Sequence, residues 1–218
     1  MRILCLHGMG TNSKVLEMQT SALRHQLSHS QSHKYEYVDG GEPMSPAPGI
    51  EAFIGQDDSL AYYHPHSAES ILTAIGDLWE YIAEEGPFDG VLGFSQGASL
   101  AAMIIARARH SNPPPFQFAI FFCAGLPYCE KSLSAGELRF LKAEDTQGPV
   151  IHVPTAHIFG KKDPDVSYSK AMTELCHPWG RVLLDHGAGH EIPRVPFETV
   201  DDMARAVEKV VTKAAIGQ

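Results

Sequence analysis

The sequence predicts an α/β fold in which helices cover both faces of a doubly wound, mostly parallel sheet. Three observations support this prediction. Short apolar runs of strand character alternate with longer helical runs along most of the 218 residues, which is the pattern of parallel sheets. One strand leads into a helix through a tight turn at Ser95 that is bracketed by glycines. Polar residues suited to chemistry follow the last two strands, at the edge where sites form in open α/β sheets.

The composition predicts one soluble globular domain that spans residues 1–218. Apolar residues make up 44% of the chain and charged residues 20%, as in ordinary globular proteins. The net charge of −9 argues against nucleic acid or an anionic membrane surface as a partner. No stretch approaches the roughly 20 apolar residues that a membrane span needs.

The N-terminus and the cysteines indicate the compartment. Residues 1–6 run directly into a strand pattern and lack the features of a secretory signal peptide. The four cysteines, Cys5, Cys123, Cys129 and Cys176, are scattered without metal-type pairing. Cys5 and Cys123 lie in strand-like runs, where a buried thiol behaves as a small hydrophobic group. The sequence therefore predicts a cytoplasmic protein.

Two strands and two helices are expected before the strand that enters the Ser95 turn. Residues 2–6 form the first strand, and a helix begins near Asn12 or Ser13. Residues 35–38 form the second strand, and Ser67 can cap the second helix. The apolar faces of the two helices carry Leu16, Leu23 and Leu27 in the first and Ile71, Leu72, Ile75, Leu78, Trp79 and Ile82 in the second.

Residues 42–66 predict a long irregular loop. Prolines and glycines break regular structure there, but the loop is too apolar for a solvated linker, since it contains Phe53, Ile54, Leu60, Tyr62 and Tyr63. Long loops in compact domains are usually functional, so this segment is expected to be a flap over the active site. The histidines of His64-Pro65-His66 are expected at the surface, because two histidines without further ligands make a poor metal site.

The second half of the chain continues the alternation. After the Ser95 turn the pattern predicts a helix at 98–108, strands at 116–122, 153–159 and 181–185, and a final helix at 199–214. Residues 124–150 form a second irregular loop, with one short helix expected around 135–141. Both long loops are expected to leave the sheet on the side where Ser95 emerges.

The turn at Ser95 has the pattern Gly93-x-Ser95-x-Gly97 between strand and helix. This is the nucleophile elbow, in which a serine on a strained turn is exposed at the end of a strand. The neighbouring glycines suit it because they carry no Cβ to collide with the turn. An ordinary strand–helix turn with an incidental serine is the alternative.

A serine hydroxyl needs a base, and the base needs an orienting carboxylate. Asp163 follows one late strand and His190 follows the next, in the order Ser, acid, His that this elbow predicts. Asp165 is the alternative acid, and Asp163 is favoured because it lies closer to its strand. A zinc site at His186 and His190 is disfavoured, because the glycines between them oppose a helix.

The first strand ends in His7-Gly8-Met9-Gly10, where a turn can supply one backbone N–H to an oxyanion. The N–H of Met9 is the expected donor. His7 is expected to brace this turn structurally and to take no part in catalysis.

The chain resembles the FSH-type serine hydrolases, a family best represented in fungi with the α/β-hydrolase fold. The resemblance is carried by residues 6–12, Asp39-Gly40, residues 48–51, residues 86–98, His157-Ile158-Phe159-Gly160-x-x-Asp163, and residues 189–193. It implies Ser95 as nucleophile, Asp163 as acid and His190 as base, with oxyanion N–H groups from Met9 and Gln96. Gly41 departs from the proline that the family usually has after Asp-Gly. Members include polyketide-releasing thioesterases and natural-product esterases.

The expected reaction is therefore the cleavage of acyl esters or thioesters without a metal or organic cofactor. The leading substrate is a polyketide-like acyl chain, and a chain carried on a carrier protein is a candidate. The alternatives are a general short-chain carboxylesterase and a non-catalytic module that binds small ligands. Apolar side chains from the two long loops are expected to line the acyl pocket, and they are Phe53, Tyr62, Tyr63 and Leu126.

Overall fold

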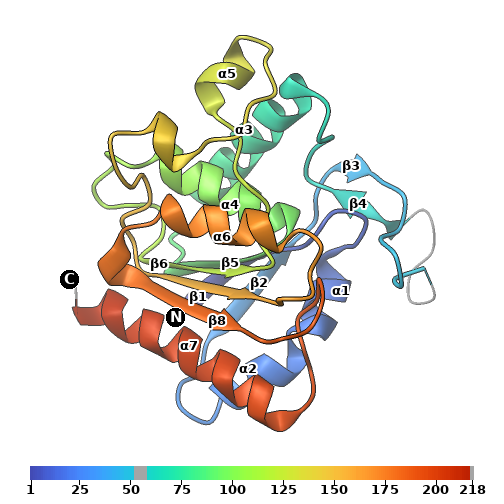
Figure 1. Cartoon of the computed structure of the whole chain (residues 1–218), viewed down its shortest axis with the longest axis vertical. Helices are drawn as coiled ribbons and strands as arrows, with labels where there is room; N and C mark the ends of the chain where they lie inside the picture. Colours follow the sequence, from blue (N-terminus) through green and yellow to red (C-terminus); the bar gives the residue numbers. More distant parts are fainter. Residues whose placement is uncertain (52–57, 217–218) are drawn as a thin grey trace.

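A computed structural model of the chain describes residues 1–51 and 58–216, and its centre is a six-stranded sheet (Figure 1). The strand order is β2-β1-β5-β6-β7-β8, and every neighbouring pair is parallel. The strands are β1 (Arg2–Leu6), β2 (Lys34–Val38), β5 (Gly90–Phe94), β6 (Phe118–Phe122), β7 (Thr155–Phe159) and β8 (Arg181–Asp185). This sheet confirms the predicted doubly wound α/β fold.

Helices cover both faces of the sheet (Figure 1). One face packs against α3 (Ala68–Glu85), α4 (Gln96–Arg107) and α6 (Val166–Glu174). The other packs against α1 (Ser13–Gln19), α2 (Ser21–Leu27) and α7 (Phe197–Ile216). Strand residues alternate between the two cores, since Leu4 and Leu6 face the first and Ile3 and Cys5 the second. Because successive side chains point to opposite faces, a strand that is buried on both faces must be apolar at every position.

The strand order places the functional loops together. The chain passes from β1 to β2 on one side and later returns to β5 on the other side of β1. Because all six strands are parallel, the loops after β1, β5, β7 and β8 emerge at one edge of the sheet. Ligands bind at such a reversal of strand order in open α/β sheets. Ser95, which follows β5, therefore lies beside the turn that follows β1.

The single helix predicted here is two helices in the structure, because the helix is interrupted at Thr20. Asn12 caps α1 as expected, with its side chain accepting the N–H of Val15 at 2.9 Å. The Thr20 hydroxyl donates to the carbonyl of Leu16 at 2.8 Å and lies 2.8 Å from the hydroxyl of Tyr37 on β2. This contact links the junction of α1 and α2 to the neighbouring strand. Leu16, Leu23 and Leu27 are still buried on the inner side.

The loop of residues 42–66 is more regular than predicted. Its ends pair as the short antiparallel strands β3 (Glu42–Pro43) and β4 (Leu60–Ala61). Leu60 also forms two backbone hydrogen bonds, both of 2.8 Å, with Gly10 and Thr11 of the turn after β1. The base of the predicted flap is thus attached to the edge of the sheet. Phe53, at the centre of this loop, lies outside the described residues.

The short helix expected at 135–141 lies earlier, because α5 spans Glu130–Ser134. Gly136 has φ of 79°, which L-residues rarely adopt, and it follows directly on the end of α5. The chain then runs extended, and Phe140 bridges to Tyr128. Helix α6 was not predicted at all. Few of its residues are buried, so its apolar periodicity is weak.

Within the described parts of the chain, no helix is long and apolar enough to cross a membrane. A cytoplasmic location stays a prediction, and so does the assignment of residues 1–218 to one domain.

The burial of His157 on β7 predicts that the fold loses stability in acid. Its side chain is 1% exposed, and its Nε2 lies 3.0 Å from the Thr155 hydroxyl. Burial, with a smaller effect of Arg181, lowers its pKa to about 3. In the unfolded chain a histidine takes up a proton below about pH 6.5. Between those values the unfolded state binds more protons, so stability is lost as the pH falls, by about 1.4 kcal/mol per pH unit.

We expect His157→Gln to remove this contribution, because glutamine stays neutral. Urea unfolding at about pH 7 and about pH 5 should show that wild type loses roughly 2 kcal/mol more than the variant. The exposed His152 provides the control, and His152→Gln should keep the wild-type loss. Equal losses in wild type and His157→Gln would show that His157 is protonated in the folded state over this range.

Candidate active site

Ser95 occupies a strained turn between β5 and α4. Its φ of 52° and ψ of −111° lie in a region that L-residues avoid, at a cost of about 1–3 kcal/mol. The surrounding structure holds this conformation, since the Ser95 N–H donates to the carbonyl of Phe122 at 2.9 Å. The Ser95 carbonyl accepts the N–H of Ser99 in α4 at 3.1 Å. The local geometry is that of a nucleophile elbow.

The two glycines of the motif are required by space. A Cβ at Gly93 would lie 2.5 Å from Cα of Ala98, and a Cβ at Gly97 would lie 2.3 Å from the carbonyl oxygen of Leu6. Both contacts are with backbone, which cannot move without displacing β1 or α4. The glycines therefore let α4 begin directly over the sheet edge. The spacing of the motif is accounted for by these two contacts.

Asp163 and His190 are brought together from loops after neighbouring strands. His190 Nδ1 lies 2.7 Å from Asp163 Oδ2, and the Asp163 side chain is fully buried while that of His190 is 33% exposed. The second carboxylate oxygen of Asp163 accepts the N–H of Asp165 at 2.8 Å. A carboxylate at Nδ1 selects the tautomer with the proton on Nδ1, which leaves Nε2 free as a base.

The two candidate acids have different positions. Asp163 faces the histidine, whereas Asp165 is exposed at the N-terminus of α6 and contributes only its backbone N–H to the pair. The geometry therefore favours Asp163 as the orienting carboxylate.

His190 lies against the elbow. Its ring centroid is 5.1 Å from that of Phe94, the residue before Ser95. Within the described residues the Ser95 hydroxyl has no hydrogen-bond partner, so the structure brings together the acid and the base and leaves the serine beside them. Catalytic hydrogen bonds often tighten only in the complex with substrate.

The two expected oxyanion donors are unpaired. Within residues 1–51 and 58–216, neither the N–H of Met9 nor that of Gln96 has an acceptor. Met9 lies in the turn after β1 and Gln96 opens α4, so both flank the point where the strand order reverses. Free N–H groups at a helix start and a glycine turn suit a developing negative charge.

His7 braces the turn that contains Met9, as expected. Its Nδ1 donates to the carbonyl of Gly8 at 2.8 Å, and its Nε2 accepts the N–H of Gly40 at 2.9 Å. The ring is fully buried, and burial lowers its pKa, which keeps it neutral as an acceptor. Its position below the turn, with both nitrogens used, assigns it a structural role.

The side chain of Gln96 has a role that the sequence did not reveal. Its Oε1 accepts the N–H of Tyr62 at 2.8 Å, and its Nε2 donates to the carbonyl of Tyr63 at 2.9 Å. The Tyr62 hydroxyl in turn donates to the carbonyl of Val38 and accepts the N–H of His7. The base of the 42–66 loop is thereby fastened to both elements that present the oxyanion donors.

Three of the four residues expected to line an acyl pocket lie in one core of the described structure. Tyr62, Tyr63 and Leu126 are buried in the core on the α3–α4 side of the sheet. Their burial agrees with packing in the core, and a role in lining an acyl pocket stays a prediction. Apolar composition in a loop cannot distinguish core packing from pocket lining, since both bury the side chain. Phe53 lies outside the described residues.

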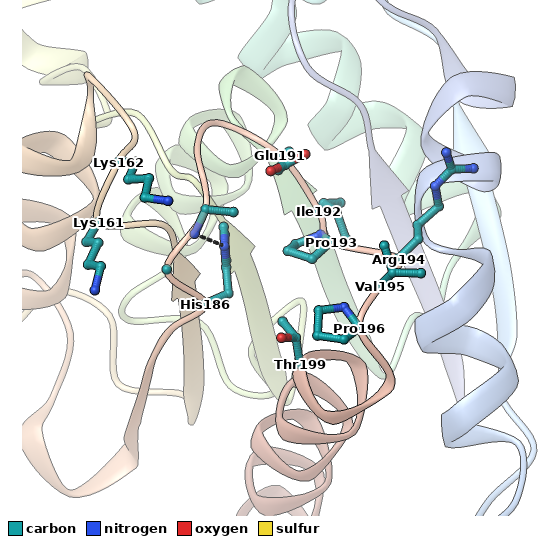
Figure 2. A pocket seen from close by; sticks show the side chains of 12 residues that line it. Lys161, Lys162, His186, Glu191, Ile192, Pro193, Arg194, Val195, Pro196 and Thr199 are labelled. Atoms are coloured by element: carbon teal, nitrogen blue, oxygen red, sulfur yellow. Dashed lines mark hydrogen bonds between the residues drawn. The ribbon is translucent and has the colours of Figure 1, made fainter.

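A cavity of about 540 Å³ lies behind the loop that carries His190 (Figure 2). His186 forms part of its wall, and its Nδ1 accepts the N–H of Ala188 at 3.2 Å. Burial lowers the pKa of His186. His190 does not line this cavity. The two histidines of the disfavoured zinc pair therefore face different surroundings.

The serine hydrolase (FSH1) family matches residues 1–199 of the chain. The chain belongs to the FSH1 serine hydrolases. Among curated relatives of this FSH1 protein, Esterase FPY3 of Fusarium mangiferae is 94% identical over the whole length of both chains. Hydrolase phiM of Talaromyces stipitatus is 31% identical, covering 96% of this chain and 87% of the relative. Esterase FUS5 of Gibberella fujikuroi is 28% identical, covering 97% and 85%.

Solved structures share the fold of this FSH1 hydrolase. A carboxylesterase from Mesorhizobium loti matches with a TM-score of 0.59 at 17% identity, covering 97% of this chain and 88% of the other. The Bacillus cereus carboxylesterase matches with a TM-score of 0.57 at 14% identity, covering 95% and 87%. At these identities the likeness concerns the α/β-hydrolase fold alone.

Proposed function

We propose that this FSH1 hydrolase cleaves acyl esters and thioesters through an acyl-Ser95 intermediate. The observation that carries the proposal is the 2.7 Å contact between Asp163 Oδ2 and His190 Nδ1, at the sheet edge where Ser95 occupies a strained elbow. These three residue types, arranged in this way, perform nucleophilic acyl transfer on many folds.

In the first half of the reaction, His190 Nε2 takes the Ser95 proton as the hydroxyl attacks the acyl carbon. The buried Asp163 carboxylate stabilises the imidazolium that forms. The N–H groups of Met9 and Gln96 donate to the negatively charged oxygen of the tetrahedral intermediate. His190 then returns the proton to the leaving alcohol or thiol, and the acyl group remains on Ser95. Water, activated by the same imidazole, releases the acid.

The proposed substrate is a polyketide-like acyl chain that is released or trimmed in natural-product biosynthesis. This part rests on the resemblance to FSH-type enzymes of such pathways and on the similarity to the fungal esterases FPY3 and FUS5. A chain held as a thioester on a carrier protein is one candidate form. We propose no metal, no organic cofactor, no nucleic acid and no membrane as partners.

Reaction with a fluorophosphonate probe tests the proposed chemistry directly. An activated serine attacks the phosphorus, so the protein should gain one probe at Ser95, located by peptide mass spectrometry. The same preparation should hydrolyse p-nitrophenyl esters. A folded protein that takes up no probe and cleaves no ester would favour the alternative of a ligand-binding module.

Chain length distinguishes the polyketide-like substrate from a short-chain carboxylesterase. We expect kcat/KM for p-nitrophenyl esters and acyl thioesters to rise from acetyl to medium-length chains. Each methylene that binds in an apolar site contributes up to about 0.8 kcal/mol, which is a factor of about four per methylene. A kcat/KM greatest for acetyl esters, declining with length, would instead identify a small-ester carboxylesterase.

A further inference from the structure

Cys123 adjoins the catalytic pair but has no part in the proposed reaction. It follows β6 directly and is 2% exposed. Three atoms lie within 4.8 Å of one another here: the Cys123 Sγ, a carboxylate oxygen of Asp163 and a ring nitrogen of His190. Three loops therefore meet at this thiol, one after each of β6, β7 and β8.

The backbone at Cys123 is strained in the same sense as that at Ser95. Its φ is 44°, and among the described residues these are the two non-glycine positions with positive φ. The Cys123 N–H donates to the carbonyl of Ile158 on β7 at 2.9 Å. Residues persist in such conformations where the surrounding structure determines them. The conformation directs the side chain toward the catalytic loops.

The thiol contacts the backbone on both sides of His190. The Cys123 sulfur lies 3.6 Å from the carbonyl oxygen of Glu191 and 4.0 Å from that of Gly189. It also lies 4.0 Å from Nε2 of His186. Both His186 and Glu191 line the cavity of about 540 Å³ shown in Figure 2. Cys123 thus lies between the wall of an open cavity and the buried side of the Asp163–His190 pair.

The thiol is a donor rather than a nucleophile. Burial, together with the charge of Asp163, raises the pKa of Cys123 to about 12, so the proton remains on sulfur at neutral pH. A protonated thiol can donate to the Glu191 carbonyl, and it is not the thiolate that attacks carbon.

We propose that Cys123 is a positioning residue that holds the His190 loop in place and keeps water from the buried side of the Asp163–His190 pair. This inference rests on the proposed function. Truncation of the side chain releases the carbonyls that bracket His190 and opens space beside the cavity. Water can then reach the Asp163 carboxylate and screen its charge. Among the described residues, Asp163 and Cys123 are the titratable groups placed beside a His190 ring nitrogen, and the loop of His190 also carries His186 and Glu191.

We expect Cys123→Ala to react with fluorophosphonate about ten- to a hundredfold more slowly than wild type, since small displacements of a catalytic group cost that much. A screened carboxylate stabilises the imidazolium less, so protonation of the base requires more acid. The acidic limb of the rate profile should therefore move to lower pH, by roughly half a unit or more. Cys123→Ser keeps a donor of smaller size and should recover part of both effects.

Cys176 provides a matched control, because its thiol is also buried and lies 3.6 Å from a backbone carbonyl, that of Met172. Each labelling rate constant is measured on the fraction of the protein that finally becomes labelled, so unfolded protein does not lower it. If Cys123→Ala does not fold, Cys123→Ser is compared with the wild type instead. Cys176→Ala should keep the wild-type acidic limb. The positioning role would be overturned if the Cys123 variant reacted more slowly but kept the wild-type acidic limb. It would also be overturned if the Cys123 variant had the same rate and the same acidic limb as Cys176→Ala. Failure of the wild type to label would overturn the proposed function itself.

Discussion

Ser95→Ala is expected to abolish fluorophosphonate labelling and to lower kcat for ester hydrolysis by about 10⁶, the loss known for the nucleophile of another serine hydrolase. The reason is that every chemical step of the proposed reaction forms or breaks a bond to the Ser95 oxygen. Active-site labelling and initial rates on a p-nitrophenyl ester measure the two effects. The fold should persist, because within the described residues the Ser95 hydroxyl makes no hydrogen bond that alanine would remove.

Ser99 is the matched control for this substitution. It lies one helical turn further along α4, and its hydroxyl donates to the carbonyl of Leu126 at 2.7 Å. Ser99→Ala should therefore keep the probe reaction and lose only stability. Hydrolysis that persisted at the wild-type rate in Ser95→Ala would show that another residue carries the acyl group.

Asp163→Asn is expected to lower kcat by about 10⁴, the effect of the corresponding change in a well-studied triad. The asparagine amide can donate toward His190 Nδ1, which favours the tautomer with its proton on Nε2. That tautomer cannot accept the Ser95 proton. Steady-state rates on the same ester measure the loss.

The competing acid gives the control. Asp165 is exposed, and only its backbone N–H contacts the pair, where it donates to Asp163 Oδ1. Asp165→Asn should change kcat little. A severe loss in Asp165→Asn together with a mild one in Asp163→Asn would show that Asp165, and not Asp163, is the acid.

Several features of this protein could be predicted because they depend on local sequence. Apolar runs of strand and helix period specify β-strands and helices, and their alternation specifies a parallel sheet. The helix caps at Asn12 and Ser67 act within one turn, and both are present. Gly93 and Gly97 mark the elbow because no other residue leaves room for α4 over β1. The order of Ser95, Asp163 and His190 then follows from which strands precede them.

Other features were decided by contacts between residues far apart in the chain. Gln96 fastens Tyr62 and Tyr63 across more than 30 positions, and Cys123 meets Glu191 across 68. Thr20, at the junction of α1 and α2, meets Tyr37 on a neighbouring strand. Sequence period reports only which face of an element is apolar, because it reflects burial and contains no information about the partner. A buried polar side chain needs a specific donor or acceptor, and only the packed sheet and loops determine which one it meets.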